Sequence, residues 1–497
     1  MISSDERATR DVAVIDVGSN SVRLVLYRLE GRAIWQVYNE KVLAGLGRDL
    51  AETGRLAPEG VVAAMAALRR FRAVLDGAGL AQVFCAATAA VREARDGRVF
   101  VDRVRAETGL VIRVLSGEEE AHCSALGVIA GQPTAEGVVG DLGGSSLELV
   151  RITDGRPGSG TTLPLGPFAL GAPGPIDAPA LSRTIRTRLA GAAPAYSAAC
   201  LHAVGGAWRN IALIHMDATR YPLRIVHQYE MTGREALEAA RFVAQQSRAS
   251  LERMPGVTRK RAETLPYAAL VLEAMVDTLG FARISFSAFG LREGLLLDAI
   301  PADIRGRDPL VEGCAAIGVR QGAAEHLGPV LHAWLEPMWA SLPPLFEAGR
   351  DAVLLAAACR LADMGARLHP DHRADLALDQ VLRAPTPGQT HAERAYLAAA
   401  VFSRFTAAQP SHPWLERLLS PERVRRARVL GAAIRLGCDL SGRSAGLLSQ
   451  SRLALDGLGL LLSVEKGAQD LTLGEQTRKR LASVAGVLQV EPRIEVV

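Results

Sequence analysis

Residues 12–27 read VAVIDVGSNSVRLVLY, and residues 138–152 read VVGDLGGSSLELVRI. Each copy is an apolar strand that runs into an aspartate, a glycine-rich turn with hydroxyl side chains, and a second alternating strand. When the copies are superposed, Asp16 aligns with Asp141 and Ser21 with Ser146, at a constant offset of 125 residues. This internal repeat predicts two related domains that face each other, each offering a backbone turn and a carboxylate to whatever lies between them.

The composition is that of an ordinary globular protein. A chain of 497 residues with 49% hydrophobic residues has room for two to four domains. Lys and Arg outnumber Asp and Glu by 57 to 53, and this net charge of +4 is too small to favour nucleic acid or membrane partners. The six cysteines lack CxxC spacing, and no run of about 18 apolar residues occurs. We therefore expect a cytoplasmic protein with reduced thiols and no zinc site.

The order of the predicted elements indicates three domains. Strand-like runs at 12–17, 22–29 and 82–86 surround an amphipathic helix at 61–79, and a similar set begins at 138. After residue 309 the strand alternation fades, and segments rich in Ala, Leu and Arg dominate. The predicted domains are an α/β domain at 1–128, a second α/β domain at 129–304 and an α-helical C-terminal domain at 305–497.

The two turns have the composition of phosphate-binding loops. Glycine permits a tight turn after the strand, and the residues at its tip present backbone N–H groups and short polar side chains. One isolated copy would fit a surface hairpin equally well, but the duplication favours binding. The predicted phosphate-binding residues of the turns are Gly18, Ser19, Asn20, Ser21, Gly143, Gly144, Ser145 and Ser146.

The aspartate before each turn suggests a metal ion. Asp16 and Asp141 cannot both face an anion without repulsion, so a divalent cation is expected to bridge them to it, directly or through water. Oxygen ligands favour Mg²⁺ over zinc, and Glu148 is a further candidate ligand. Another divalent cation, or a monovalent cation such as K⁺, is the alternative.

A run of three acids, SGEEEA, holds Glu118, Glu119 and Glu120 where a strand is predicted to end and a helix to begin. Three adjacent carboxylates cannot share one environment, so at least one of them should point into the cleft. The competing interpretation is that these acids only complement the positive end of the helix.

Six segments in order resemble the exopolyphosphatase and guanosine pentaphosphate phosphohydrolase (Ppx/GppA) family, which belongs to the acetate and sugar kinase, heat-shock protein and actin superfamily. The resemblance covers both α/β domains well and the C-terminal third loosely. The segments are ATAAVREARDG at 87–97, LSGEEEAHCSALGV at 115–128, VGDLGGSSLELV at 139–150, LPLGPFAL at 163–170, AVGGAWRNIA at 203–212 and SAFGLREGLL at 287–296.

The resemblance implies two actin-like (ribonuclease H-like) α/β domains around a cleft, and a homodimer. It implies that Glu120 is the catalytic base that aligns water, with Glu119 as the alternative. Arg23 and Arg92 match family positions at the cleft, where a guanidinium can hold phosphate in two-pronged fashion. Arg209 and Arg292 are equally compatible with helix ends or ion pairs.

The sequence departs from the family pattern in two places. The usual DIGGGS is DLGGSS here, so Ser145 replaces a third glycine and is expected to narrow the turn or crowd the phosphate. The segment CRLADMGARLHPDH at 359–372 resembles a His-Asp phosphohydrolase fold, but Ala362 stands before Asp363 where its metal motif needs His. We therefore expect a degenerate all-α domain without a second active site.

The predicted activity is removal of the terminal phosphate from linear inorganic polyphosphate. The alternative is hydrolysis of guanosine pentaphosphate, with guanosine tetraphosphate or pentaphosphate as the bound nucleotide. An aromatic content of 5% and no evident base-stacking pair favour the inorganic polymer. A sugar or acetate kinase and a non-catalytic sensor of polyphosphate or guanosine tetra- and pentaphosphate are the remaining alternatives.

Overall fold

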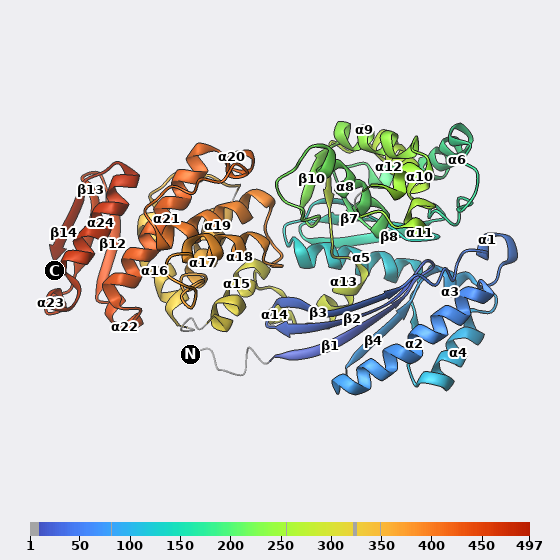
Figure 1. Ribbon diagram of the computed structural model, residues 1–497, viewed down its shortest axis with the longest axis horizontal. Helices are drawn as coiled ribbons and strands as arrows, with labels where there is room; N and C mark the ends of the chain where they lie inside the picture. Colours follow the sequence, from blue (N-terminus) through green and yellow to red (C-terminus); the bar gives the residue numbers. More distant parts are fainter. Residues whose placement is uncertain (1–8, 81, 255, 322–325, 348) are drawn as a thin grey trace. The chain divides into compact units, whose positions relative to one another are not determined.

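The computed structural model describes residues 9–497 apart from 81, 255, 322–325 and 348 (Figure 1). The contacts divide the chain into two compact units, Met1–Gly306 and Arg307–Val497. Within the described ranges, no helix is both long enough and apolar enough to cross a membrane.

The first sheet has the strand order β3-β2-β1-β4-β5 (Figure 1). Its strands are β1 (Arg10–Val17), β2 (Val22–Glu30), β3 (Ala33–Val42), β4 (Val83–Ala87) and β5 (Arg113–Val114). The first three strands are antiparallel, and β1, β4 and β5 are parallel. Ala13, Ile15 and Val17 pack with α2 (Pro58–Ala78) and α4 (Gly97–Thr108) on one face. The short helices α1 (Leu50–Thr53) and α3 (Ala89–Glu93) complete this part, which we call domain I.

The second sheet repeats this plan in the order β8-β7-β6-β9-β11, with β10 added beyond β11. Its strands are β6 (Gly137–Leu142), β7 (Leu147–Thr153), β8 (Arg156–Leu163), β9 (Cys200–Val204), β10 (Tyr229–Thr232) and β11 (Arg283–Phe286). The first three are again antiparallel, and β6, β9 and β11 are parallel. We call this sheet and its covering helices domain II. The same order and directions in both sheets agree with the expected duplication.

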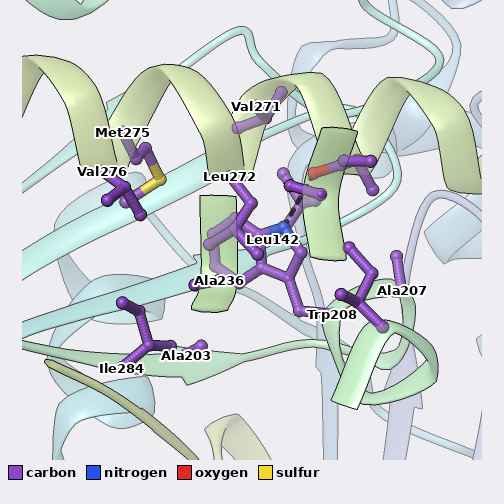
Figure 2. Close-up of a cluster of buried hydrophobic side chains, with 14 of the residues drawn as sticks. Leu142, Ala203, Ala207, Trp208, Ala236, Val271, Leu272, Met275, Val276 and Ile284 are labelled. Atoms are coloured by element: carbon purple, nitrogen blue, oxygen red, sulfur yellow. Dashed lines mark hydrogen bonds between the residues drawn. The ribbon is translucent and has the colours of Figure 1, made fainter. Parts of the chain in front are cut away.

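The helices of domain II surround a core centred on Trp208 (Figure 2). Trp208 is fully buried, and its indole N–H donates to the Ala268 carbonyl oxygen at 2.9 Å. It belongs to α8, so this packing fixes where that helix begins. The helices are α6 (Ala178–Ala190), α7 (Ala193–Tyr196), α8 (Gly206–Ala218), α9 (Gly233–Ala244), α10 (Arg248–Glu252), α11 (Arg259–Ala262) and α12 (Leu265–Leu279).

Two helices contact both sheets. Residues of α5 (Gly117–Gly131) pack with Val12 and Val14 of β1, and with Val139 of β6. The helix α13 (Leu291–Ala299) lies against α5 and is followed by α14 (Ala302–Arg305). The predicted boundary between residues 128 and 129 falls inside α5, which joins the two domains.

The C-terminal unit is mainly helical, but it is not all-α. Strands β12 (Ser451–Asp456), β13 (Gly459–Val464) and β14 (Pro492–Val496) form a three-stranded sheet, in which alternate residues such as Leu460 and Leu462 are buried. The longer helices are α15 (Pro309–Arg320), α16 (Leu327–Ala340), α17 (Arg350–Arg360), α18 (Arg373–Arg383), α19 (His391–Phe405), α21 (Pro421–Ser441) and α24 (Glu475–Leu488). The short ones are α20 (Leu415–Leu418), α22 (Ala445–Leu448) and α23 (Gln469–Thr472).

The segment compared with a His-Asp site lies in this unit. Asp363 is buried and its carboxylate lies 3.3 Å from Nε of Arg443, whereas His369 and His372 are exposed. In the described part of the chain, no cluster of three or more His, Cys, Asp or Glu side chains is arranged to hold a metal ion. Asp363 therefore has an ion-pair partner of its own.

Candidate functional site

A pocket of about 160 Å³ opens between domains I and II. The turns β1–β2 and β6–β7 line it, together with residues at the N-terminal ends of α5, α8 and α13. A cavity needs only about 10 to 15 Å³ of such volume to hold one water molecule. The pocket therefore has room for a ligand with several heavy atoms.

The two turns have the same geometry. The Gly18 N–H donates to the Ser21 carbonyl oxygen at 2.9 Å, and the Gly143 N–H donates to that of Ser146 at 2.9 Å. The turns also approach each other, because a Cβ placed on Gly144 would lie 3.0 Å from the Ser19 Cβ. A side chain at 144 would crowd this contact, which explains the glycine.

Ser145 does not occupy the position expected from the sequence. Its side chain lies beside Gly47, where an added Cβ would be 2.9 Å from the Ser145 Oγ, and it does not line the pocket. The buried hydroxyl has no hydrogen-bond partner. The expected crowding of a phosphate by this side chain is therefore corrected, because Ser145 packs against the loop that follows β3.

The two aspartates both line the pocket. Asp16 lies 3.4 Å from a terminal nitrogen of Arg292, and Asp141 accepts a hydrogen bond from the Ser124 hydroxyl at 2.5 Å. Burial raises the pKa of each carboxyl, and the charge of Asp16 raises that of Asp141 further. Two acids whose charges disfavour each other are the donors that Mg²⁺ uses when phosphates and waters complete its octahedron. Asp16 and Asp141 thus fit this ion.

Glu120 is the acid of the EEE run that faces the pocket. It is 7% exposed, and its Oε2 accepts a hydrogen bond from Arg92 at 2.8 Å. Burial raises the pKa of Glu120 to about 7, although Arg92 acts in the opposite direction. A carboxyl with a pKa near neutrality suits a general base.

Glu119 and Glu148 lie outside the pocket lining. Glu119 forms a capping box at the start of α5, where its carboxylate accepts from the Ser116 N–H at 2.8 Å, and it also pairs with Arg113. This exposed acid has the helix-start role that the competing interpretation proposed. Glu148 is fully buried, and burial together with the charge of Glu120 raises its pKa well above the usual range.

Five cationic side chains line the same pocket: Arg23, Lys41, Arg209, Arg261 and Arg292. Burial and the charges of Arg292 and Arg209 lower the pKa of Arg23 to about 10. Burial alone would lower the pKa of Arg292, but neighbouring Glu293, Tyr27 and Asp16 raise it. The other three cations have no acidic partner among the contacts within the described chain. This excess of positive charge is suited to a polyanion.

Most of the predicted site residues come together here. The exceptions are Glu119, Ser145, Glu148 and Arg92, the last of which reaches the site only through Glu120. The sequence reasoning left Arg209 and Arg292 undecided and missed Lys41, Arg261 and Thr88. Thr88 lies in the quoted ATAAVRE motif, so this motif could have indicated it. Lys41 and Arg261 carry no motif signal and are brought in by the ends of β3 and α11.

The model of the Ppx/GppA phosphatase family matches residues 25–303, which is more than half of the chain. The chain belongs to this family. A second model, described as the exopolyphosphatase C-terminal family, matches residues 339–491. The predicted family is thus confirmed, and its C-terminal part is covered as well.

Curated relatives and solved structures of the Ppx/GppA type match the first unit. Exopolyphosphatase 1 of Mycobacterium tuberculosis is 26% identical over 310 residues, which cover 59% of this chain and 90% of the relative. An exopolyphosphatase from Cytophaga hutchinsonii has a TM-score of 0.55 at 21% identity, covering 59% of this chain and 98% of that one. The Aquifex aeolicus PPX-GPPA enzyme has a TM-score of 0.50 at 24% identity, covering 58% and 99%. These structures establish the fold of the first unit.

Proposed function

We propose that this chain is an exopolyphosphatase that hydrolyses the terminal phosphate of linear inorganic polyphosphate, with Glu120 directing the attacking water. Membership of the Ppx/GppA family makes it a phosphate hydrolase. The observation that carries the proposal is the pairing of one buried acid, Glu120, with two facing backbone turns and a cationic wall in the same pocket. A terminal phosphate held by the turns would leave the rest of the polyanion against the cations.

Phosphoryl transfer of this kind depends on positioning and charge neutralisation more than on covalent catalysis. The amides of the turns at 18–21 and 143–146 would hold the terminal phosphate. Glu120 would accept a proton from water aligned with the bond that breaks, and Arg92 would hold its carboxylate in place. Mg²⁺ held by Asp16 and Asp141 would offset charge on the phosphates.

Guanosine pentaphosphate is the second candidate substrate, because it carries the same terminal phosphoanhydride. A guanine base would need a stacking surface. Phe168 is the aromatic residue of the pocket lining within the described chain, and it is 5% exposed and packed with Ala172 and Tyr267. This favours the inorganic polymer over the nucleotide.

Phosphate release should be measured with long-chain polyphosphate, guanosine pentaphosphate, and ATP plus sugars, each with and without Mg²⁺. We expect release from polyphosphate to be the fastest of the three. Glu120→Gln should reduce it by about 10³-fold, since a general base and its alignment of water contribute about 10²–10⁴. Glu119→Gln is the matched control, because its carboxylate caps α5 and should leave the rate within about threefold.

Near-normal turnover by Glu120→Gln would remove Glu120 from this role. Faster release from guanosine pentaphosphate would replace the substrate. Phosphate transfer to a sugar would indicate a kinase, and tight binding without turnover a sensor. The proposed homodimer can be checked in the same preparation by its mass in solution.

A further inference from the structure

Three residues at the same register cross the first sheet and lead away from the phosphate-binding turn. Asp16 on β1 pairs directly with Arg23 on β2, and Arg23 pairs directly with Lys41 on β3. Directly paired residues of antiparallel strands point to the same face of a sheet. Since neighbouring strands lie about 4.8 Å apart, Lys41 is roughly 10 Å across the sheet from Asp16. All three residues line the pocket.

The pairing of Arg23 with Lys41 is unfavourable without a ligand, because like charges directly opposite each other destabilise a sheet. Nε of Arg23 donates to the side-chain oxygen of Asn39 at 2.7 Å, which is a neutral partner. The described contacts give Lys41 no hydrogen bond or ion pair. The ladder therefore ends in two adjacent cations that no carboxylate neutralises.

A second group of positive charges faces the pocket from domain II. The helix α8 begins at Gly206 without a side-chain cap, and Arg209 lies in its first turn with a buried, unpaired Nε. Arg261 lies over this end of the helix, because a Cβ on Gly206 would be 2.7 Å from an Arg261 terminal nitrogen. Acids normally occupy such a position, since the amino end of a helix is positive. An anion would reconcile this arrangement.

The basic run at 259–261 is divided between structural and unpaired side chains. Arg259 lies 3.8 Å from Glu252, and the Lys260 ammonium donates to the Leu43 carbonyl oxygen at 3.0 Å. The latter bond joins α11 to the segment directly after Lys41. Arg261 is left facing the pocket beside Lys41. The two cations are thus held near each other from opposite domains.

We propose that Lys41, together with Arg261 and the first turn of α8, forms a distal subsite for a phosphate at least two links from the terminal one. Lys41 is thereby a specificity-determining residue that favours longer linear phosphates over pyrophosphate. The inference rests on the proposed function for its substrate class.

The electrostatics of Lys41 agree with this role. Desolvation in the pocket, followed by the charges of Arg261, Arg23 and Arg209, lowers the pKa of Lys41 to about 7, and only Asp16 opposes them. A cation destabilised by its surroundings gains the most from a bound anion. Lys41 is the sole lysine of the lining, among four in the chain.

Binding should be measured by calorimetry in the full chain carrying Glu120→Gln, so that turnover does not interfere. The ligands are pyrophosphate, tripolyphosphate and a longer linear polyphosphate. Adding Lys41→Met should lower the ratio of affinities for the longest ligand and pyrophosphate about tenfold, as expected for one charged hydrogen bond. Lys41→Arg, which keeps the charge, should restore most of the ratio. Lys479→Met on α24 is the control for loss of one positive charge.

An unchanged ratio in Lys41→Met would overturn the distal subsite, and so would an equal loss for all three ligands. The result is separate from the test of the proposed function. A chain that binds long polyphosphate with this preference but releases no phosphate would refute the hydrolase and keep the subsite.

Discussion

The three adjacent glutamates of α5 show how one helix start produces different chemical environments. Glu119 faces solvent and closes the capping box, whereas Glu120, one residue later, is buried in the pocket. Consecutive residues of a helix are rotated by about 100°, so they cannot share a face. The capping box fixes this rotation and therefore determines which acid enters the pocket.

The pH dependence of the reaction should report on Glu120. A base must be ionised to accept a proton, so kcat/KM should fall as pH drops below the Glu120 pKa of about 7. Arg92 lowers this pKa, and Arg92→Met should therefore move the acid limb upward by about one pH unit. The measurement is the pH profile of kcat/KM for phosphate release.

Arg98→Met is a suitable control for this shift, because Arg98 is an exposed arginine of α4 in the same domain. Its profile should coincide with that of the wild type. An acid limb that stays in place in Arg92→Met would contradict the assignment of Glu120 as the titrating base.

At the scale of elements, the position of the site depends on the crossing of α5 and α13. Their backbones touch, since a Cβ on Gly294 would lie 1.8 Å from the Cys123 carbonyl oxygen, and one on Gly127 would lie 2.0 Å from that of Gly290. A buried bond from the Tyr27 hydroxyl to Glu293 at 2.5 Å ties α13 to β2. This crossing places Glu120 and Arg292 in one pocket.

Gly294→Ala should disrupt this crossing. The added methyl group would meet backbone atoms that cannot rotate away, so we expect a loss of about 2 kcal/mol or more in the free energy of unfolding. Gly77→Ala is the matched control, since Gly77 also lies in a helix and a Cβ there meets nothing within 4 Å. It should be neutral or stabilise by about 0.5–1 kcal/mol. Equal midpoints of urea unfolding for the two variants would refute the close contact.

At the scale of the whole molecule, the first unit holds the complete pocket. The pocket lining ends at Arg292, inside the unit Met1–Gly306. Relatives matched by this part are covered almost to their full length, 98% for the Cytophaga hutchinsonii structure. A chain of this size buries enough surface to fold alone.

Residues 1–306 should therefore fold without the C-terminal unit. We expect a cooperative thermal transition by circular dichroism, and hydrolysis of tripolyphosphate within about threefold of the full chain, since its pocket is intact. A fragment that lacks a transition, or that folds but loses this activity, would show that the C-terminal unit is required for the site.

The sequence by itself determined the duplicated hairpins, the family and most of the pocket, because strand periodicity and turn composition are local properties that a repeat makes conspicuous. Asp16, Asp141, both turns and the choice of Glu120 followed from such patterns and from the resemblance. Only the tertiary structure decided that Ser145 packs on Gly47, that Lys41 and Arg261 face the pocket, and that the C-terminal unit includes a sheet. These facts depend on contacts between segments far apart in the chain, and no local pattern records which of many exposed cations such contacts will gather.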